Sequence, residues 1–472
     1  MASQQELLSG YPAPSDISAE AVVAARGSTA RALVVLDDDP TGTQSVADLP
    51  VLNSWTAEDL AWALGTGAPA VYVMTNSRSL DPEAAAQRNE EVVSAALIAA
   101  DRLGVEVDFV SRGDSTLRGH FPLEPDVIIA TMAAAQRQVD GIIIAPAFPD
   151  AGRITIGSVH YAGNERTGYG PVGESEFARD ATFGYRSSDL RGWVEEKTDA
   201  RVSAADVVAI TLHDIRGGAE AVAAKLAQLS NASCAVVDVV EESDLRALAL
   251  GVLLAEARGQ RFVYRVGPPF VRAMIGQAVR APLSADDVAR IRPQASANGG
   301  LIVVGSHVAL TTSQLDVLRD RRSPVEYEID VTQVLGERGA DHLDDIVARV
   351  SESLRSENVV VRTSRTLVRG ADGDDSLRIA RAISDAVVHV VRTVLTQTRP
   401  RFVIAKGGIT SSDVAARGLE IGRAQVRGPM LPGIVSLWEP ITGPAQGIPY
   451  IVFAGNVGTQ ESLADVVDTL ST

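Results

Sequence analysis

The sequence predicts an α/β protein of two domains, each a mostly parallel sheet flanked by helices. Its 472 residues are more than a single hydrophobic core usually contains, so the length favours more than one domain. The composition, 46% apolar with only 4% aromatic residues and 40 glycines, suits buried parallel strands. Short apolar runs also alternate with Ala-rich helical stretches, as crossover units between parallel strands do.

In the first half, this alternation predicts helices near 82–102 and 125–138 and strands near 31–36, 70–74, 105–110, 141–147, 207–212, 234–240 and 260–267. Residues 146–200 interrupt it with a long Gly-rich and aromatic stretch, which we expect to be an ordered, functional loop region. The polar segment 281–300 is the best linker, so we expect domains at 1–290 and 291–472. The second domain should hold a helix near 376–397 and strands near 301, 358, 401, 422, 434 and 449.

The chain is acidic, with 60 Asp and Glu against 43 Lys and Arg and a net charge of −17. Such a field repels phosphate backbones and anionic lipids, so we expect no nucleic-acid or membrane partner. The single Cys234 excludes an intrachain disulfide. The first residues lack the pattern of a secretion signal, and no apolar run is long enough to span a membrane, so we expect a cytoplasmic protein.

Three glycine loops in the second domain each follow a predicted strand. Their candidate nucleotide-binding residues are Gly305, Ser306, Lys406, Gly407, Gly408, Thr410, Ser411, Gly455, Asn456 and Gly458. A strand, a glycine turn and a helix N-terminus together present backbone N–H groups to a phosphate. Helix capping alone would explain any one loop, but three in one domain favour nucleotide binding. None of the three is a Walker A loop or a GxGxxG fingerprint.

An acidic run, "LDDDPTGTQ", follows the first predicted strand and contains Asp37, Asp38, Asp39 and Thr41. Asp37, Asp39 and Thr41 fit the DxDxT pattern of haloacid dehalogenase-type phosphatases, in which the first Asp is a nucleophile. Alternatively, one Asp is a general base toward a substrate hydroxyl while a neighbour holds Mg²⁺ or another hydroxyl. A plain acidic turn also fits the letters. The phosphatase interpretation leaves the glycine loops without a role.

A second polar cluster follows the strand near 105–110. Its candidate substrate-binding residues are Arg112, Asp114, Ser115 and Arg118, joined by Asp37 and Thr41 of the acidic run and by the more distant Arg153. Arginine suits the carboxylate of a polyhydroxylated acid, and Asp and Ser suit its hydroxyls. Arg118 could instead only neutralise Asp114. His120 is expected to be structural.

Four motifs in order resemble the four-carbon acid sugar kinase family, formerly a domain of unknown function, which includes threonate, erythronate and 3-oxo-tetronate kinases. They are Asp38-Asp39-Pro40-Thr41-Gly42, the DSTLRG of 114–119, the GGITS of 407–411, and Gly455-Asn456. The similarity runs from about Leu33 to Val467.

The resemblance implies a sugar-acid-binding first domain, an ATP-binding second domain, and transfer of the γ-phosphoryl group to a terminal hydroxyl in a cleft between them. The implied cofactors are ATP and Mg²⁺, with no metal ligand assigned, and either Asp38 or Asp39 would be the base. The expected partners are a small sugar acid and ATP, and a homodimer is an open option. A non-catalytic metabolite sensor is a third interpretation.

Three positions depart from the family pattern. Arg112 stands where the family has Lys, His120 where it has Asn, and Ile409 where an acidic residue is common. The chain therefore resembles a divergent branch, and a branched acid such as 3-oxo-isoapionate fits as well as threonate does.

Overall fold

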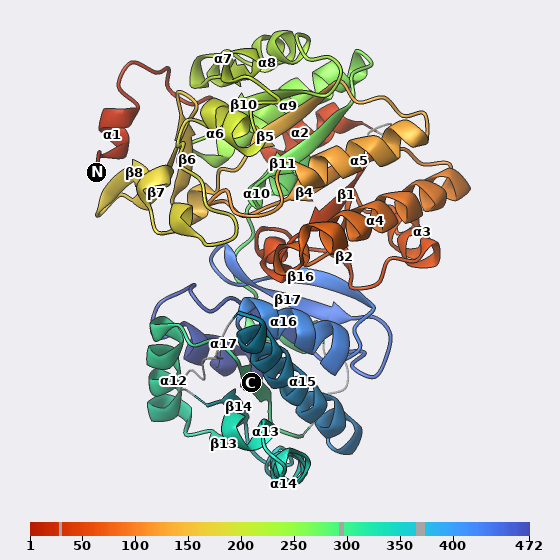
Figure 1. The fold of residues 1–472 in the computed structure, drawn as a ribbon, viewed down its shortest axis with the longest axis vertical. Helices are drawn as coiled ribbons and strands as arrows, with labels where there is room; N and C mark the ends of the chain where they lie inside the picture. Colours follow the sequence, from red (N-terminus) through yellow and green to blue (C-terminus); the bar gives the residue numbers. More distant parts are fainter. Residues whose placement is uncertain (28–30, 292–296, 365–372) are drawn as a thin grey trace. The chain divides into compact units, whose positions relative to one another are not determined.

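The computed structural model describes residues 1–27, 31–291, 297–364 and 373–472 (Figure 1). The chain forms two compact units, and each consists of two segments. The first unit is Met1–Gly42 with Ser54–Val279, and the second is Thr43–Asn53 with Arg280–Thr472. The sequence predicts a single crossing near 290, within a linker whose residues 292–296 lie outside the described residues.

The first unit contains a sheet of parallel strands in the order β3-β1-β4-β11-β5-β10-β9. These strands are β1 (Ala32–Asp37), β3 (Ala70–Met74), β4 (Val107–Arg112), β5 (Gly141–Ala145), β9 (Val208–Ile210), β10 (Ser233–Val237) and β11 (Phe262–Val266). All seven lie where the sequence predicts them, because a parallel strand covered on both faces is a nearly continuous apolar run.

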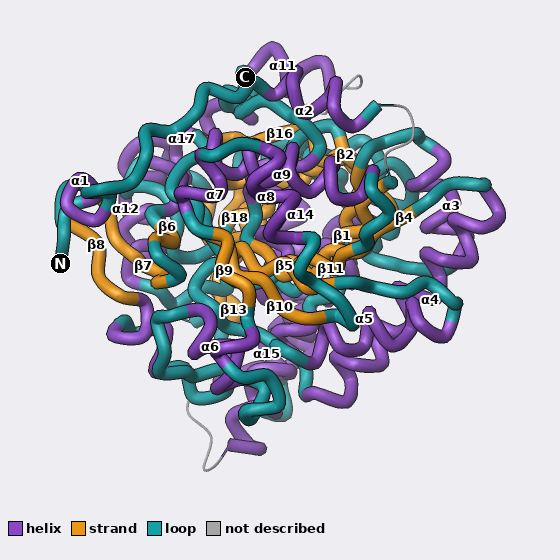
Figure 2. Tube along the Cα trace, turned by 90° about the horizontal axis from the view of Figure 1, so that it is seen from above, coloured by secondary structure: helices purple, strands orange, loops and turns teal. Residues whose placement is uncertain are grey.

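Helices flank this sheet, and α4 and α5 lie side by side along it (Figures 1 and 2). The helices are α2 (Ala19–Arg26), α3 (Ala57–Gly65), α4 (Pro82–Leu103), α5 (Leu123–Ala134), α7 (Leu212–Arg216), α8 (Ala219–Leu226), α9 (Glu242–Ala257) and α10 (Pro269–Met274). Helix α4 has local start and stop signals: the Asp81 side chain accepts a hydrogen bond from the Ala84 N–H, and Gly104 ends the helix at φ 66°. Helix α5 ends at Ala134 rather than at the predicted residue 138, and Gln136 beyond it has a φ of 60°.

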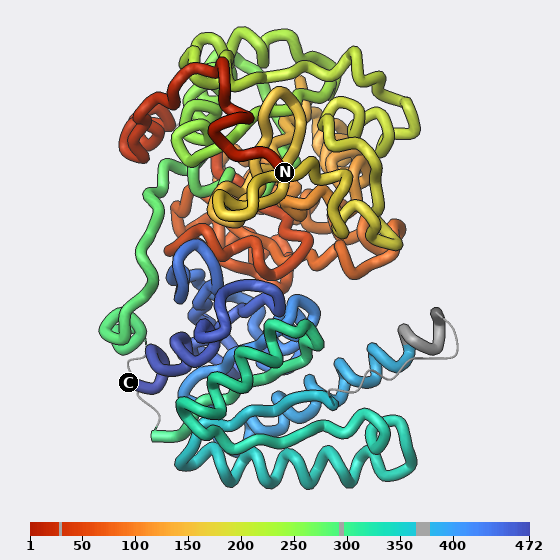
Figure 3. The backbone as a smooth tube through the Cα atoms, turned by 90° about the vertical axis from the view of Figure 1, so that its left-hand side faces the viewer, coloured from red at the N-terminus to blue at the C-terminus, as the bar shows by residue number. Residues whose placement is uncertain are grey.

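Residues 146–200 are ordered, as expected, but they are more regular than a loop. They contain α6 (Leu190–Lys197) and an antiparallel sheet of β6 (Arg153–Ile156), β7 (Val159–Asn164) and β8 (Gly168–Pro171). The chain start, with the short helix α1 (Gln4–Leu7), runs beside this sheet, where Ala2 pairs with Tyr169 (Figure 3). The letters GYGPVG at 168–173 fit the GxGxxG spacing, yet they form β8 and a 3-10 turn rather than a loop that opens an α-helix.

The second unit has a mixed sheet. Strands β13-β14-β12-β15-β18 are parallel, and β17, β16 and β2 continue the sheet antiparallel. The strands are β2 (Leu49–Leu52), β12 (Leu301–Val304), β13 (Val325–Ile329), β14 (Val359–Thr363), β15 (Val403–Lys406), β16 (Arg423–Leu431), β17 (Ile434–Pro440) and β18 (Tyr450–Phe453). Strands β2 and β13 have no counterpart among the predicted strands.

The helices of this unit are α11 (Ala285–Ile291), α12 (Ala309–Arg322), α13 (Val331–Val334), α14 (Gly339–Ser353), α15 (Gly373–Gln397), α16 (Gly408–Asp413) and α17 (Ser462–Ser471). Helix α15 corresponds to the predicted helix near 376–397. The separate segment Thr43–Asn53 is well fixed here, because β2 pairs with β16 and Trp438 Nε1 donates to Thr43 Oγ1 over 2.9 Å. No helix among the described residues is long and apolar enough to cross a membrane.

Candidate functional site

The acidic run begins with Asp37, which pairs in register with Arg112. These residues end the adjacent parallel strands β1 and β4, so their side chains meet at the carboxyl edge of the sheet. Arg112 Nε donates to Asp37 Oδ1, and both side chains are buried. Burial raises the pKa of Asp37, while the Arg112 guanidinium opposes that shift. Gly42 lies against this pair, and a Cβ there would clash with both side chains.

Asp38 is held by Arg78, a residue that the sequence does not single out. Arg78 Nη2 and Nε donate to the two Asp38 oxygens over 2.6 and 3.0 Å, so the pair is bidentate. Arg78 lies in the short turn that follows β3, and β3 is the neighbour of β1. The available signal was "TNSRSL" directly after the predicted strand at 70–74, because neighbouring parallel strands end at the same edge.

Asp39 is the most accessible of the three carboxylates. Its side chain is 21% exposed, against 1% for Asp38. Asp39 Oδ1 accepts hydrogen bonds from the Thr41 N–H and hydroxyl over 2.9 and 2.6 Å, whereas the contact of Oδ2 within the described part of the chain is Arg78 Nη1 at 3.5 Å. Burial alone would raise the pKa of Asp39, but Arg78 and Arg112 together hold it below the ordinary value. The lowered pKa favours the ionised form of Asp39, and its Oδ2 has a single long contact, to Arg78.

The second motif contains another fixed carboxylate, Asp114. Its Oδ2 accepts from Arg118 Nε over 2.6 Å and from the Thr116 hydroxyl, while its Oδ1 has no hydrogen bond to any described residue. Desolvation opposes ionisation of Asp114, yet Arg78 and Arg118 outweigh it and lower the pKa to about 2. The backbone of this loop is anchored at Ser115, whose carbonyl oxygen accepts from the buried His160 over 2.7 Å.

A buried polar network supports this loop from below, and sequence reasoning missed it. Arg265, inside the apolar run of β11, donates to Glu124 over 2.6 Å and to Ser111 over 2.8 Å. A Cβ at Gly113 would lie 2.5 Å from the Arg265 guanidinium carbon, so a glycine is needed there. Arg265, held by Glu124, therefore packs directly against the backbone of the second motif at Gly113.

His120 contacts backbone carbonyls and an aromatic ring. Its Nε2 lies 3.0 Å from the carbonyl oxygens of both Ser77 and Leu80, and Phe183 packs edge-on against its ring.

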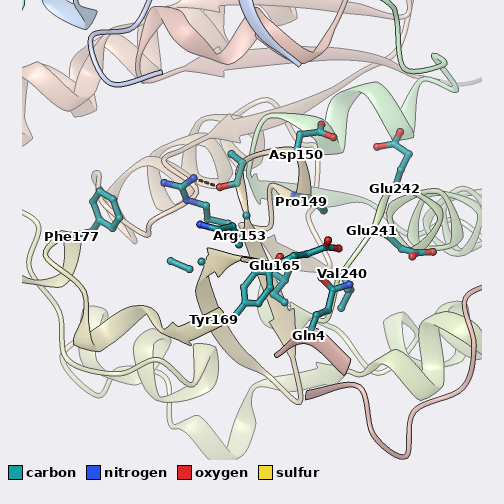
Figure 4. Close-up of a pocket in the computed structure, with 16 residues that line it drawn as sticks. Gln4, Pro149, Asp150, Arg153, Glu165, Tyr169, Phe177, Val240, Glu241 and Glu242 are labelled. Atoms are coloured by element: carbon teal, nitrogen blue, oxygen red, sulfur yellow. Dashed lines mark hydrogen bonds between the residues drawn. The ribbon is translucent and has the colours of Figure 1, made fainter. Parts of the chain in front are cut away.

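Arg153 begins β6 and lies apart from the acidic run. Its guanidinium carbon is 5.7 Å from the centre of the Phe177 ring, and that of Arg118 is 5.2 Å from the same ring. Arg153 and Phe177 line a pocket of about 890 Å³ beyond the carboxyl ends of β5 and β10 (Figure 4). Most of the predicted substrate residues thus lie around Asp38 and Asp114. Arg153 lies outside this cluster and shares the Phe177 ring with Arg118.

In the second unit, the loops after β12, β15 and β18 lie together, because these strands are neighbours. The N–H groups of Gly305 and Ser306 donate to the Lys406 carbonyl over 3.2 and 3.3 Å, and the Gly407 N–H donates to the Phe453 carbonyl over 2.8 Å. Gly407 has a φ of 125°, a conformation that favours glycine. The three loops therefore form one glycine-lined cradle.

Small hydroxyl side chains fill the space left by these glycines. Thr410 lies where a Cβ of Gly305 would be, and Ser306 lies where a Cβ of Gly455 would be. Ser411 Oγ donates to the Ala405 carbonyl over 2.8 Å. The remaining predicted residues are more peripheral: Gly408 begins α16, Asn456 is exposed, and Gly458 packs against Ser462 at the start of α17.

Lys406 is the charged residue of this cradle. Its side chain is fully buried, its Nζ donates to the Ala454 carbonyl over 2.8 Å, and the same atom lies 3.8 Å from the centre of the Phe453 ring. No carboxylate of the described residues pairs with it. Burial lowers the pKa of Lys406 to about 7. A buried amine without an anionic partner is suited to an anionic ligand such as a phosphate.

No group of three or more His, Cys, Asp or Glu within the described ranges is arranged to hold a metal ion. The acidic run agrees with this, because the Asp37 and Asp38 carboxylates already pair with arginines.

Comparisons with known proteins give the two units different domain descriptions. A family model described as a sugar-binding N-terminal domain matches residues 33–274, and one described as a nucleotide-binding C-terminal domain matches residues 301–463. No curated protein matches the chain at a significant level.

Solved structures share the fold at low sequence identity. A Haemophilus influenzae protein of the family DUF1537 is 17% identical, with a TM-score of 0.64 over 93% of this chain and 100% of its own. A Salmonella typhimurium LT2 protein with a provisional tRNA synthase name is 18% identical, with a TM-score of 0.66 over 92% of this chain and 98% of its own. The two domain matches cover most of the sequence and both units, and the chain belongs to the four-carbon acid sugar kinase family.

Proposed function

We propose that the protein is an ATP-dependent kinase that phosphorylates a terminal hydroxyl of a small sugar acid. The observation that carries this proposal is Lys406, a buried amine without a carboxylate partner among three glycine loops. This arrangement suits the phosphates of ATP, since glycines allow a ligand to approach the backbone closely and a buried cation neutralises its charge. The first unit matches a sugar-binding domain and contains Asp39 and Asp114, whose pKa values are lowered, so we expect it to bind the acceptor.

Asp39 is the better candidate for the general base. Both oxygens of Asp38 are occupied by Arg78, whereas Asp39 keeps an accessible oxygen. In the proposed step, the substrate hydroxyl oxygen forms a bond to the γ-phosphorus and the bond from that phosphorus to the β,γ-bridging oxygen breaks. The hydroxyl proton passes to Asp39, and ADP leaves. When bound with ATP, Mg²⁺ would neutralise charge on the phosphates.

Asp38 and Asp114 would then act by position rather than by proton transfer. Arg78 holds Asp38 and lies beside Asp114 as well, so one cation organises both motifs. The free Oδ1 of Asp114 is suited to accept a hydrogen bond from a second substrate hydroxyl.

The phosphatase alternative is less well supported. It needs Asp37 as a nucleophile, but this side chain is fully buried and paired with Arg112. A metabolite sensor would leave the accessible Asp39 without a purpose. Trapping of a phosphoryl adduct on Asp37, or tight acid binding without turnover with any nucleotide, would respectively favour these alternatives.

The direct test is ADP release from Mg-ATP, coupled to NADH oxidation, across D- and L-threonate, erythronate, 3-oxo-tetronate and 3-oxo-isoapionate. We expect turnover with one of these acids and none without an acid. If Mg-ATP bound but every acid left ADP release at background, the four-carbon substrate class would be wrong. Absence of nucleotide binding would contradict the kinase proposal itself.

A further inference from the structure

Two arginines lie against Phe177, and they differ in how their charge is used. Arg118 donates to Asp114 over 2.6 Å, and its Nη1 also lies 3.8 Å from Asp180. Two carboxylates thus already surround this one guanidinium. A further anion at Arg118 would have to compete with both of them.

Arg153 has no such partner. Among the described residues, the only hydrogen bond of its side chain goes from Nη1 to the Ala151 carbonyl of its own turn, and its buried Nε has no partner there. No carboxylate of the described residues lies within ion-pair distance of it. Burial lowers the pKa of Arg153, and nearby Arg118 adds to this effect while Asp114 opposes it. Its donors, in a planar fork, are suited to a carboxylate.

The pocket beside Arg153 has the character of a site for hydroxylated acids. Two of its carboxylates, Asp150 and Glu242, are both paired with the buried Arg272, the Asp150 contact being 3.1 Å. Glu241 accepts from Ser243 and Glu165 is exposed, so both can still accept hydrogen bonds from hydroxyl groups. Its volume of about 890 Å³ lies in the range of drug-sized ligand sites, which leaves room for acids longer than four carbons or branched.

We infer that Arg153, and not Arg118, binds the carboxylate of the acid, with Phe177 as the platform of its guanidinium. This inference rests on the proposed function and names the residue that selects acids over neutral sugars. Arg118 then serves as a positioning residue that holds Asp114 in place.

The test is calorimetric binding of acids to the full chain in the absence of nucleotide. The probes are the acids named above and a six-carbon aldonic acid, each beside its carboxamide, which has a similar shape without the charge. Wild type should prefer an acid over its amide. Arg153→Gln should lose that preference and bind the acid about ten- to a hundredfold more weakly, because one charge-assisted contact is lost. Arg153→Lys should keep part of it.

The matched control is Arg186→Gln, which removes an arginine of the same unit whose side chain is 92% exposed. It should leave acid binding unchanged. Urea unfolding midpoints that match wild type will show that the Arg153 variants are folded. An unaltered acid preference in Arg153→Gln, or wild-type protein that binds none of the acids, would overturn the inference. Arg153-dependent acid binding without ADP release would refute the proposed kinase reaction and leave the inference standing.

Discussion

The two units differ in how they hold their buried charged side chains. At the carboxyl edge of the first sheet, side chains carry the charge, and most of it is cancelled inside the protein: Arg112 by Asp37, Arg78 by Asp38, and Arg118 by Asp114. In the second unit, three glycine loops lie together, and Lys406 is buried among them without a carboxylate partner among the described residues.

This difference suggests what each unit can discriminate. A lattice of fixed side chains can recognise the positions of individual hydroxyl and carboxylate groups. A glycine cradle instead recognises phosphate, which is common to all nucleotides. Changes in the first unit should therefore affect chemistry and acid choice, and changes in the second should affect nucleotide affinity.

The largest effect should come from Asp39→Asn. Loss of the base should lower turnover by about 10²- to 10⁴-fold while Mg-ADP affinity stays the same. Asp38→Asn should differ, because it breaks the bidentate pair with Arg78 and should destabilise the fold by about 3 kcal/mol. Steady-state kinetics with urea unfolding separates the two, and the exposed Asp101→Asn serves as the control. Full turnover in Asp39→Asn would exclude it as the base.

Next in size is Gly407→Ala. The residue has a φ of 125°, and an added Cβ would lie 3.2 Å from Thr410 Oγ1, so the cradle must distort. We expect Mg-ADP affinity to fall at least tenfold and acid affinity to remain unchanged. Gly447→Ala is a matched control, because its φ is 74° but open space surrounds it. Equal losses of nucleotide affinity in both variants would show that strain, and not the cradle, is responsible.

Lys406 should make nucleotide binding depend on pH. Phosphates favour the ammonium form, so binding raises a pKa that is about 7 in the free protein and takes up a proton above that pH. Mg-ADP affinity should therefore fall by up to about tenfold per pH unit above pH 7, where the phosphates themselves are fully ionised.

Calorimetry in buffers of different ionisation enthalpy measures this proton uptake. Lys406→Met should abolish it and weaken binding, whereas Lys225→Met, in the first unit, should change neither. Proton uptake that persists in Lys406→Met would assign it to another group.

The smallest effect is expected for His120→Asn. Among the described residues, the imidazole bonds to two backbone carbonyls, so its loss should cost about 1 kcal/mol of unfolding free energy and leave turnover almost unchanged. A urea titration and a single kinetic assay suffice. A large loss of turnover at unchanged stability would place His120 in the chemistry.

Much of the fold was predictable because buried parallel strands are apolar runs that end at Gly or polar residues, as β12 and β15 do. Strands β6, β7 and β8 were not, because their glycines and aromatics hide the alternation of an antiparallel strand.

The sequence predicted which motifs form the candidate site, but it could not predict the role of each residue within them. Adjacent carboxylates look equivalent in a sequence, and only their partners distinguish Asp38 from Asp39. Those partners can be distant along the chain, as Arg78 is from Asp38. Arg265 gave no signal in the sequence because it lies inside the apolar run of β11.

Segment Thr43–Asn53 belongs to the second unit although it lies early in the chain, and this limits where the protein can be cut into separate domains. Cutting the chain after Val279 would leave residues 280–472 without β2, and so leave one edge of β16 with unpaired backbone groups. Trp438 and Ser436 would lose their buried partner Thr43. Such a fragment should aggregate, and a nucleotide-binding module that works alone would need Thr43–Asn53 grafted back onto it.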